Sequence, residues 1–361
     1  MEHPFFIMSC LSPLTGWRAI CGKNENGKWP VVFDISKGFR DMPVVVPCGQ
    51  CIGCRLDKAK DWAGRCIQES KLWDSNYFLT LTYDDALTPV HDYGVGFDPK
   101  RHRPSDGSLM PYHLQLFWKR LRKWVFSKAP SEAKIAAFRR SSSAISPYRS
   151  GLGREPVYEL VDGKKTLVNG VRYFAAGEYG SQTQRPHYHA IVFNLEIPDL
   201  IPAGRGANGD PLWVSNILND IWGHGRVIVG AVTFESAGYV ARYTTKKIYG
   251  AKSDEVYGSR IEPFSRCSNR PGVGANWFIK YADEVSRVGF VLINGHRNPV
   301  PRYYLNKMEK MNKEDYLTYK KKRDRIMLRS KDSPDRQEAR LAQRKEFLEY
   351  SSTRLHRGFG G

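Results

Sequence analysis

The stretch that most constrains the fold is Arg185–Phe193, which reads Arg-Pro-His-Tyr-His-Ala-Ile-Val-Phe. This run of apolar and aromatic residues predicts a β-strand, along which alternate side chains point to opposite faces. His187 and His189 therefore share one face of the strand, and Tyr188 lies on the other. Two imidazoles on one face can bind a divalent metal ion, although paired histidines on a half-buried strand are also common as solvated or hydrogen-bonded side chains.

A second strand is predicted just upstream, in the segment Tyr173–Glu178. The polar residues 180–185 that separate the two strands read as a turn, so the strands are expected to pair as an antiparallel hairpin. In that hairpin Glu178 lies beside His187 and His189. Two imidazoles and one carboxylate leave coordination positions of a metal ion open, and open positions are typical of catalytic rather than structural sites.

Two tyrosines four residues apart form the next candidate motif, within a helix predicted from about Phe234 to Ile248. Side chains at positions i and i+4 of a helix lie on the same face, so Tyr239 and Tyr243 point in one direction and Lys246 joins them. A phenol with a pKa of about 10 is a weak nucleophile at neutral pH unless a cation or a metal-bound substrate assists it. Such a tyrosine pair on its own is more often helix packing, but a lysine and a metal site together favour a nucleophilic role.

Seven cysteines, an odd number, favour metal ligands over a disulfide framework. Three of them share one Cys-x-x-Cys-x-x-Cys cluster: Cys48, Cys51 and Cys54. Such a cluster binds a tetrahedral zinc ion when a fourth ligand comes from elsewhere; Cys10 is the preferred candidate, with Cys21 and Cys66 as alternatives. The predicted zinc is structural, since it would tie the N-terminal loop to a helix predicted over residues 55–73. An iron–sulfur cluster is the less favoured interpretation.

A formal net charge of +19 and a sequence pI near 9.6 indicate a polyanionic partner, and nucleic acid is the favoured class. No apolar run is long enough to span a membrane, and Met1–Pro4 lack the basic start of a signal peptide, so we expect a protein that works in a cytoplasm. The segment Gly22–Trp29 matches most of a phosphate-binding loop, but Trp29 replaces the hydroxyl residue that would hold magnesium. No nucleotide-driven motor is therefore predicted.

The order of the predicted elements indicates the fold class. The region with the histidines and tyrosines reads strand, helix, hairpin, helix, strand and helix, which predicts an α+β fold with a mainly antiparallel central sheet flanked by helices. A Cys-rich zinc module precedes this core, and a basic helical extension follows it. The predicted parts are the Cys-rich module 1–75, the core 76–250, the C-terminal part of the core 251–305 and the basic helical tail 306–361. Helices are predicted at about residues 55–73, 113–127, 213–221 and 234–248, and a further strand at about 225–232.

Taken together, these motifs resemble the HUH endonuclease superfamily, whose members initiate rolling-circle replication. The segment Tyr77–Asp84 resembles the first motif of such initiators, a central strand of their sheet. The chain resembles in particular the replication initiation proteins of gokushovirus-type Microviridae, small phages with single-stranded DNA. The likeness runs from about residue 8 to residue 305 and includes three further stretches: Val46–Cys54, Leu114–Lys123 and Asn269–Gly274.

The resemblance implies an HUH endonuclease-like fold and a reaction in which single-stranded DNA at a phage origin is nicked. It implies that Glu178, His187 and His189 hold a magnesium or manganese ion that activates the scissile phosphate. One of the two tyrosines would attack, giving a 5′-phosphotyrosine and a free 3′-hydroxyl that the host DNA polymerase extends. The second tyrosine would then cut the regenerated origin, and the displaced strand would be religated into a circle.

The same resemblance assigns supporting roles to basic residues and to partners. Lys246 would stabilise the phenolate or the phosphate, and Arg185, Arg242 and Lys247 would contact DNA. A host helicase would unwind the duplex in the host bacterial cytoplasm. Two alternatives stay open: a non-catalytic, zinc-containing protein that binds single-stranded nucleic acid, and a relaxase or transposase of the same superfamily. The double tyrosine favours the phage initiator over the latter.

Overall fold

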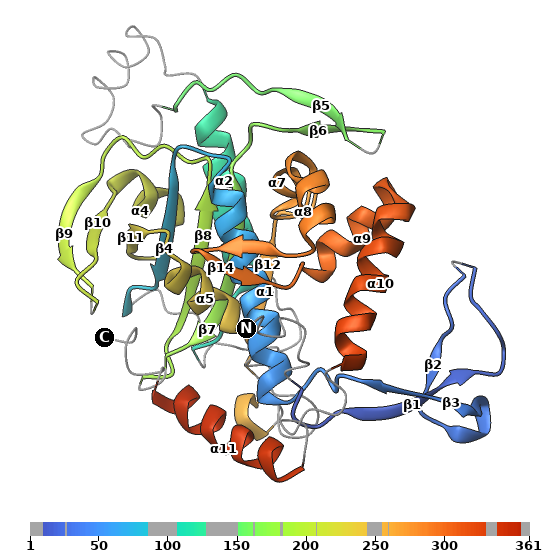
Figure 1. The fold of residues 1–361 in the computed structure, drawn as a ribbon. Helices are drawn as coiled ribbons and strands as arrows, with labels where there is room; N and C mark the ends of the chain where they lie inside the picture. Colours follow the sequence, from blue (N-terminus) through green and yellow to red (C-terminus); the bar gives the residue numbers. More distant parts are fainter. Residues whose placement is uncertain are drawn as a thin grey trace, which may run out of the picture.

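The computed structural model describes residues 10–25, 27–85, 107–127, 151–161, 163–180, 183–206, 208–243, 255–258, 260–329 and 338–354. At its centre lies a seven-stranded sheet in the order β12-β7-β8-β4-β11-β10-β9, in which every neighbouring pair is antiparallel (Figure 1). The strands are β4 (Asn76–Thr82), β7 (Arg172–Tyr179), β8 (Pro186–Phe193), β9 (Ile201–Arg205), β10 (Pro211–Val214), β11 (Val227–Ala231) and β12 (Phe264–Cys267). The predicted α+β fold with a mainly antiparallel central sheet flanked by helices is confirmed.

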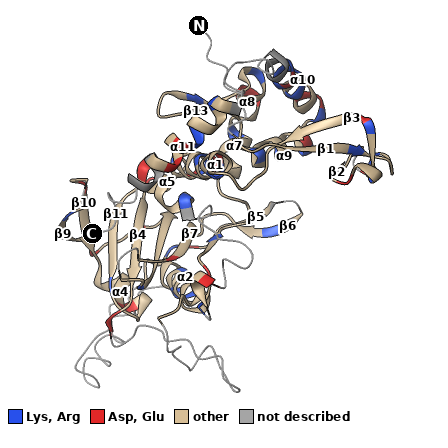
Figure 2. Ribbon diagram, turned by 90° about the horizontal axis from the view of Figure 1, so that it is seen from below, with Lys and Arg blue, Asp and Glu red and all other residues tan. Residues whose placement is uncertain are grey.

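Two pairs of helices enclose the sheet, one pair on each face (Figure 2). The pair on the first face is α1 (Ile52–Ser70) and α5 (Phe234–Tyr243), and the pair on the second face is α2 (Pro111–Phe126) and α4 (Asn216–Trp222). Each face has its own apolar core. Phe117 and Trp124 of α2 are fully buried in the second-face core, and such burial contributes about 2–3 kcal/mol per side chain.

β7 and β8 form the predicted hairpin, and β4 pairs with the other edge of β8. In this register Glu178 is opposite His187, and Thr80 is opposite His189. Residues directly opposite each other in an antiparallel pair project from the same face of the sheet. These four side chains therefore lie on the face covered by α1 and α5, while Tyr188 enters the other core, as the alternation predicts.

One predicted helix is wrong at its start. The helix expected over residues 213–221 begins at Asn216, because Pro211–Val214 pair with β11 as strand β10. Ser215 ends that strand and caps the helix, since its hydroxyl accepts a hydrogen bond from the Leu218 amide at 3.1 Å. The other predicted helices correspond to α1, α2 and α5, and the predicted strand near residue 228 is β11.

A buried ion pair ties α1 to the sheet. Glu69, near the end of α1, accepts hydrogen bonds from the Arg172 guanidinium, from the Gly274 amide at 2.7 Å and from the Trp73 indole at 3.1 Å. One carboxylate thus holds together the helix, the first residue of β7 and the loop before residue 275. Because an unpaired buried charge costs several kcal/mol, loss of Arg172 would destabilise the chain far more than loss of a surface ion pair.

A third core is built from the later part of the chain. Its elements are α7 (Ala275–Lys280), α8 (Ala282–Val288), β13 (Val291–Ile293), β14 (His296–Asn298), α9 (Arg302–Met311) and α10 (Lys313–Arg329). Tyr304 and Met308 of α9 and Tyr319 of α10 are buried there. The basic extension therefore starts with helices that pack against the body, and the division of the chain into four parts remains a prediction.

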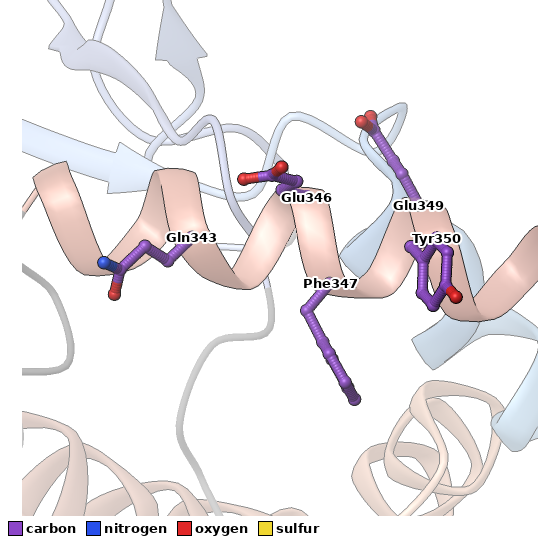
Figure 3. Close-up of a pocket in the computed structure, with 5 residues that line it drawn as sticks. All are labelled: Gln343, Glu346, Phe347, Glu349 and Tyr350. Carbon is purple, nitrogen blue, oxygen red and sulfur yellow. The ribbon is translucent and has the colours of Figure 1, made fainter.

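The last described helix is α11 (Glu338–Arg354), which contacts α1 (Figure 1). Phe347 and Tyr350 of this helix are 67% and 56% exposed and line a shallow hollow. Figure 3 shows Phe347 projecting from the side of the helix opposite to Glu346 and Glu349. α11 thus has an aromatic side and an acidic side.

Two smaller sheets extend from the body (Figure 1). They are a three-stranded sheet of β1 (Leu14–Ala19), β2 (Val31–Val32) and β3 (Gly38–Val46), and a hairpin of β5 (Tyr158–Val161) and β6 (Lys164–Leu167). Lys and Arg residues are spread over these sheets and over α10 (Figure 2). Among the helices that the structure describes, none has the length and apolar composition to cross a membrane.

Candidate metal centre

The three predicted ligands of the first metal site meet at one carboxylate oxygen. Glu178 Oε1 lies 3.0 Å from His187 Nε2 and 2.9 Å from His189 Nε2. The donor atoms of the three residues all lie within 4.8 Å of one another, so a single ion could contact all of them. Two imidazole nitrogens and one carboxylate oxygen suit a divalent ion that keeps further positions for water or substrate.

A separate group holds the second nitrogen of each imidazole. His187 Nδ1 donates to the Arg185 carbonyl oxygen at 3.0 Å, which leaves Nε2 as the nitrogen for a ligand. His189 Nδ1 lies 3.0 Å from the Thr80 hydroxyl oxygen, and the Phe78 ring stacks on this imidazole with the centroids 5.4 Å apart. Partners of this kind orient metal-binding histidines and fix their tautomer.

Glu178 is buried, and its charge is stabilised by its neighbours. Burial raises the pKa of its carboxyl group, but the hydrogen bonds from His187 and His189 and the charges of these rings hold the pKa well below its usual range. The carboxylate is therefore ionised at neutral pH. A buried anion flanked by two imidazoles with fixed orientation is a donor set that fits a divalent cation.

Tyr239 is the nucleophile candidate that the structure places at this site. Its hydroxyl donates to Glu178 Oε1 at 3.3 Å, and its ring lies edge-on to His189 with the centroids 4.9 Å apart. α5 brings the phenol there because Val240 and Ala241 are buried in the core between α5, α1 and the sheet. The hydroxyl is thus directed at the same oxygen that the two histidines share.

Only part of the other predicted active-site residues falls within the described residues. Tyr243 is the last residue of α5, one helical turn beyond Tyr239, and its side chain lies outside the described part. Lys246 and Lys247 also lie outside the described residues. The Arg242 guanidinium carbon lies 5.9 Å from the centre of the Tyr239 ring, so this charge is near the phenol.

Arg185, a predicted DNA contact, already has two partners. Its guanidinium forms an ion pair with the Asp85 carboxylate and donates to the Tyr83 carbonyl oxygen. These contacts join the start of β8 to the segment that follows β4. A DNA phosphate would have to compete with Asp85 for this arginine.

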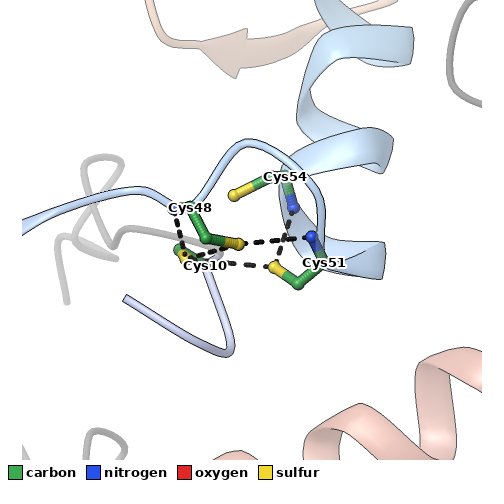
Figure 4. A group of neighbouring side chains, drawn as sticks. All are labelled: Cys10, Cys48, Cys51 and Cys54. Carbon is green, nitrogen blue, oxygen red and sulfur yellow. Dashed lines mark hydrogen bonds between the residues drawn. The ribbon is translucent and has the colours of Figure 1, made fainter. Parts of the chain in front are cut away.

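A second candidate metal centre lies at the start of α1 and consists of four cysteines: Cys10, Cys48, Cys51 and Cys54 (Figure 4). Their sulfur atoms all lie within 4.8 Å of one another, which fits the four-sulfur donor set of a tetrahedral metal site. Backbone amides point at the sulfurs: the Cys48 amide donates to Cys10 Sγ at 3.2 Å and the Cys51 amide to Cys48 Sγ at 3.3 Å. The alternatives Cys21 and Cys66 lie outside this group, on the surface and in the core under α1, respectively.

The thiol of Cys51 is the one that the fold makes most acidic. Burial alone raises its pKa, but donation from the Cys54 and Leu11 amides outweighs burial and lowers the pKa to about 6. Burial raises the pKa values of Cys10 and Cys54. A cation at this centre would favour thiolates throughout, so its binding would release protons.

Thr80 and Phe78 are site contacts that the sequence patterns alone do not predict. The segment Tyr77–Asp84 is predicted as a central strand, but no role for its side chains follows from that prediction. Only the register of β4 against β8 places Thr80 opposite His189. The signal in the sequence is the pattern Thr80-Leu81-Thr82, which marks a polar face on an otherwise apolar strand.

Matches to known proteins cover the site and most of the chain. A family model of replication-associated proteins, of the ORF2 type, matches residues 158–248, which include the hairpin of the metal centre and α5. Replication-associated protein VP4 of Bdellovibrio phage phiMH2K is 30% identical over 333 residues, which cover 91% of this chain and 85% of that protein. Replication-associated protein ORF2 of Spiroplasma virus 4 is 29% identical over 334 residues, with 90% and 88% covered. Replication-associated protein ORF4 of Chlamydia phage 1 is 26% identical over 275 residues, with 75% and 55% covered.

An α+β chain with a two-histidine, one-glutamate centre beside a helical tyrosine is thus similar over its length to proteins of phage replication. It belongs to the family of replication-associated proteins of small phages, the Microviridae. No solved structure matches the chain.

Proposed function

We propose that this protein is a metal-dependent DNA-nicking and strand-joining endonuclease of the HUH type that initiates rolling-circle replication of a small phage. The observation that carries the proposal is the convergence of Tyr239, His187 and His189 on one oxygen of Glu178, within 3.3 Å. A nucleophile and an ion site that share a buried carboxylate suit phosphoryl transfer. The relatives support it, because all three are replication-associated proteins.

Glu178, His187 and His189 would hold a magnesium or manganese ion, which when bound neutralises charge on the scissile phosphate and activates it for attack. Thr80 and the Arg185 carbonyl keep the two imidazoles in place for that task. The Tyr239 phenol forms a bond to phosphorus while the bond from phosphorus to the 3′ oxygen breaks. The phenol gives up its proton to solvent and the leaving 3′ oxygen takes one, so the products are a 5′-phosphotyrosine and a 3′-hydroxyl.

Tyr243 is the second nucleophile in this proposal. A residue four positions along a helix lies on the same face and about 6 Å along the axis, so both phenols serve one phosphate position in turn. One tyrosine holds the displaced strand while the other cuts the regenerated origin, and the freed 3′-hydroxyl attacks the first adduct to close the circle. Lys246 would assist the phenolate or the phosphate, and Arg185, Arg242 and Lys247 would hold the single-stranded origin DNA.

The reaction requires partners, and we place it in the cytoplasm of the host bacterium. The 3′-hydroxyl needs a host DNA polymerase, and duplex DNA ahead of the fork needs a host helicase. The four-cysteine group would hold a structural zinc ion, because four sulfur ligands leave no position open for substrate. That ion fastens the N-terminal segment to the helix against which α5 packs.

Metal-dependent nicking tests the proposal directly. Glu178→Gln keeps the shape of the side chain but removes the charge that a cation needs, so nicking of labelled single-stranded origin DNA in manganese should fall at least about 100-fold. Glu235→Gln is the matched control, because Glu235 lies exposed in the first turn of α5. Nicking that continues in excess chelator, or survives Glu178→Gln, would contradict the proposal. DNA binding without any nicking by the wild-type chain would favour the non-catalytic, zinc-containing binding protein instead.

A further inference from the structure

A second basic site lies at the other end of β7 from the metal centre. A cavity of about 200 Å³ opens between α2, the start of β7 and the loop that follows β12. None of the eight residues that line it is acidic, and three of them are arginines: Arg122, Arg172 and Arg270. The cavity is too small for a nucleotide cofactor, since ligand pockets usually measure about 300–1,000 Å³.

The three arginines are not equivalent. Arg172 is neutralised by Glu69 and also donates to the Pro271 carbonyl oxygen at 2.8 Å. Arg122 and Arg270 have no carboxylate partner within the described residues. The cavity therefore presents two positive charges that the described part of the fold leaves uncompensated.

Arg122 is built into the wall rather than free on the surface. Its guanidinium carbon lies 5.5 Å from the centre of the Tyr173 ring, and Tyr173 stacks on Trp118 with the centroids 4.0 Å apart and the planes 7° from parallel. Partial burial lowers the pKa of Arg122, as expected of a cation that is held out of water. A planar guanidinium fixed against an aromatic ring keeps its donors aimed in one direction, which suits an anion with several oxygens.

Two polar side chains add uncharged donors beside the arginines. The Ser268 oxygen accepts a hydrogen bond from the Tyr173 amide at 3.1 Å, which leaves its hydroxyl proton for another acceptor. The Asn269 carbonyl oxygen accepts from Cys267 Sγ at 3.2 Å, so the amide group of Asn269 remains a donor. Two guanidinium groups with a hydroxyl and an amide form a donor set that matches a phosphate group.

The distance from the metal centre suggests which phosphate this is. Arg172 and Glu178 stand six residues apart at opposite ends of β7, which is about 20 Å along the strand. Consecutive phosphates along one strand of a duplex advance by about 3.4 Å, so about 20 Å corresponds to roughly six nucleotides. A phosphate bound here would belong to DNA that flanks the cut.

Resting on the proposed nicking function, we propose that the cavity at Arg122 and Arg270 binds a backbone phosphate of the double-stranded DNA flanking the nick site. Such a contact carries no base specificity, but it sets the register of the DNA against the metal centre. It would act beside Tyr239 without touching the reacting atoms.

Fluorescence anisotropy can test this with two labelled DNAs: a short single strand that covers only the nick site, and the same strand extended by a duplex flank of about ten base pairs. Arg270→Gln should weaken binding of the flanked DNA about tenfold and lower the slope of log K against log salt by about one. Arg122→Lys keeps the charge but loses the two-pronged donor, so a smaller loss is expected. Lys123→Gln is the matched control, since Lys123 is an exposed cation on α2 that does not line the cavity.

Equal and small effects of Arg270→Gln and Lys123→Gln on the flanked DNA would overturn the assignment. Titration with inorganic phosphate separates the two sources of a phosphate group. Micromolar binding of free phosphate that Arg270→Gln abolishes, without any effect on flanked DNA, would show a small-anion site instead. Wild-type nicking of the short strand is measured in parallel, so failure of the nicking function is distinguishable from failure of this contact.

Discussion

The two histidines of the metal centre are oriented by different means. His187 is held through a backbone carbonyl, that of Arg185, so its orientation follows from the turn of the hairpin. His189 depends on side chains, because the Thr80 hydroxyl lies against Nδ1 and the Phe78 ring stacks on the imidazole. Substitutions on β4 can therefore disturb one ligand and leave the other in place.

Thr80→Val should reduce metal affinity and nicking by about 10- to 100-fold, the range expected when the outer partner of a metal-binding histidine is lost. The change removes the hydroxyl while keeping the branched shape of the side chain, so the strand should fold. Thr82→Val is the control, because Thr82 lies on the same face of β4 but its hydroxyl donates to the Arg226 carbonyl oxygen. Manganese titration of both variants measures the effect, and equal affinities would show that Thr80 does not position His189.

A histidine on the other face of the sheet predicts how stability depends on pH. Burial, followed by the neighbouring charges of His224 and Arg120, lowers the pKa of His113 to about 3. An unfolded histidine titrates near 6.5, so between these values the unfolded chain binds the proton more readily. His113 therefore destabilises the fold as the pH falls below about 6.5, and its contribution reaches roughly 2 kcal/mol by pH 5.

His113→Asn should flatten this dependence while leaving a hydrogen-bonding group for the Tyr83 hydroxyl, which lies 3.0 Å from His113 Nδ1. Urea unfolding at pH 7.5 and pH 5 measures the free energy lost by each variant. The wild-type chain should lose roughly 2 kcal/mol more than the variant across this range. His296→Asn, at an exposed position, serves as the control; parallel losses in wild type and His113→Asn would contradict the account.

Among the elements, α1 links the two candidate metal centres. Its start carries the four-cysteine group, its middle packs against α5, and Glu69 near its end holds β7 through Arg172. The position of Tyr239 on α5 thus depends on a helix that is fastened at both ends. A structural ion at the cysteines would act on the nucleophile only through α1.

Removal of one cysteine ligand should loosen that helix. Cys54→Ser is expected to abolish stoichiometric zinc and to lower the melting temperature by at least about 5 °C, because a bound metal stabilises only the folded chain. Cobalt substitution reports the site independently, through the absorption of cobalt–thiolate bonds. Cys21→Ser, at an exposed cysteine outside the group, should retain both metal and stability. A metal-free wild-type chain with the same melting temperature as the metal-loaded chain would refute a structural ion.

The elements that carry the site could be predicted from sequence because their patterns are local. Alternation along Arg185–Phe193 predicts which face holds the histidines, and one turn joins that strand to the strand of Glu178. Arg122 and Arg270 show the limit: they are far apart in the chain and meet only because β12 pairs with β7 beside α2. The predicted start of α4 is wrong for a similar reason, since pairing with β11 decides that Trp213 is in a strand.

For the whole molecule, the antiparallel sheet brings three distant segments to one point. β4 supplies Thr80, the β7–β8 hairpin supplies the three ligands, and α5 supplies Tyr239. The net charge of +19 surrounds this centre with a field that attracts DNA regardless of sequence. Specific chemistry would then come from the one place where a phenol meets the candidate ion site.

Covalent adduct formation is the most direct measurement of that chemistry. Wild-type protein, Tyr239→Phe, Tyr243→Phe and the double variant would be mixed with end-labelled single-stranded origin DNA and manganese, with chelator controls, and separated on a denaturing gel. The account predicts a labelled band of protein size that requires metal, and that maps by peptide mass spectrometry to Tyr239 or Tyr243. It also predicts that the double variant loses this band entirely while still binding DNA. An adduct that persists in the double variant, or the absence of any adduct from a wild-type chain that binds the DNA, would contradict it.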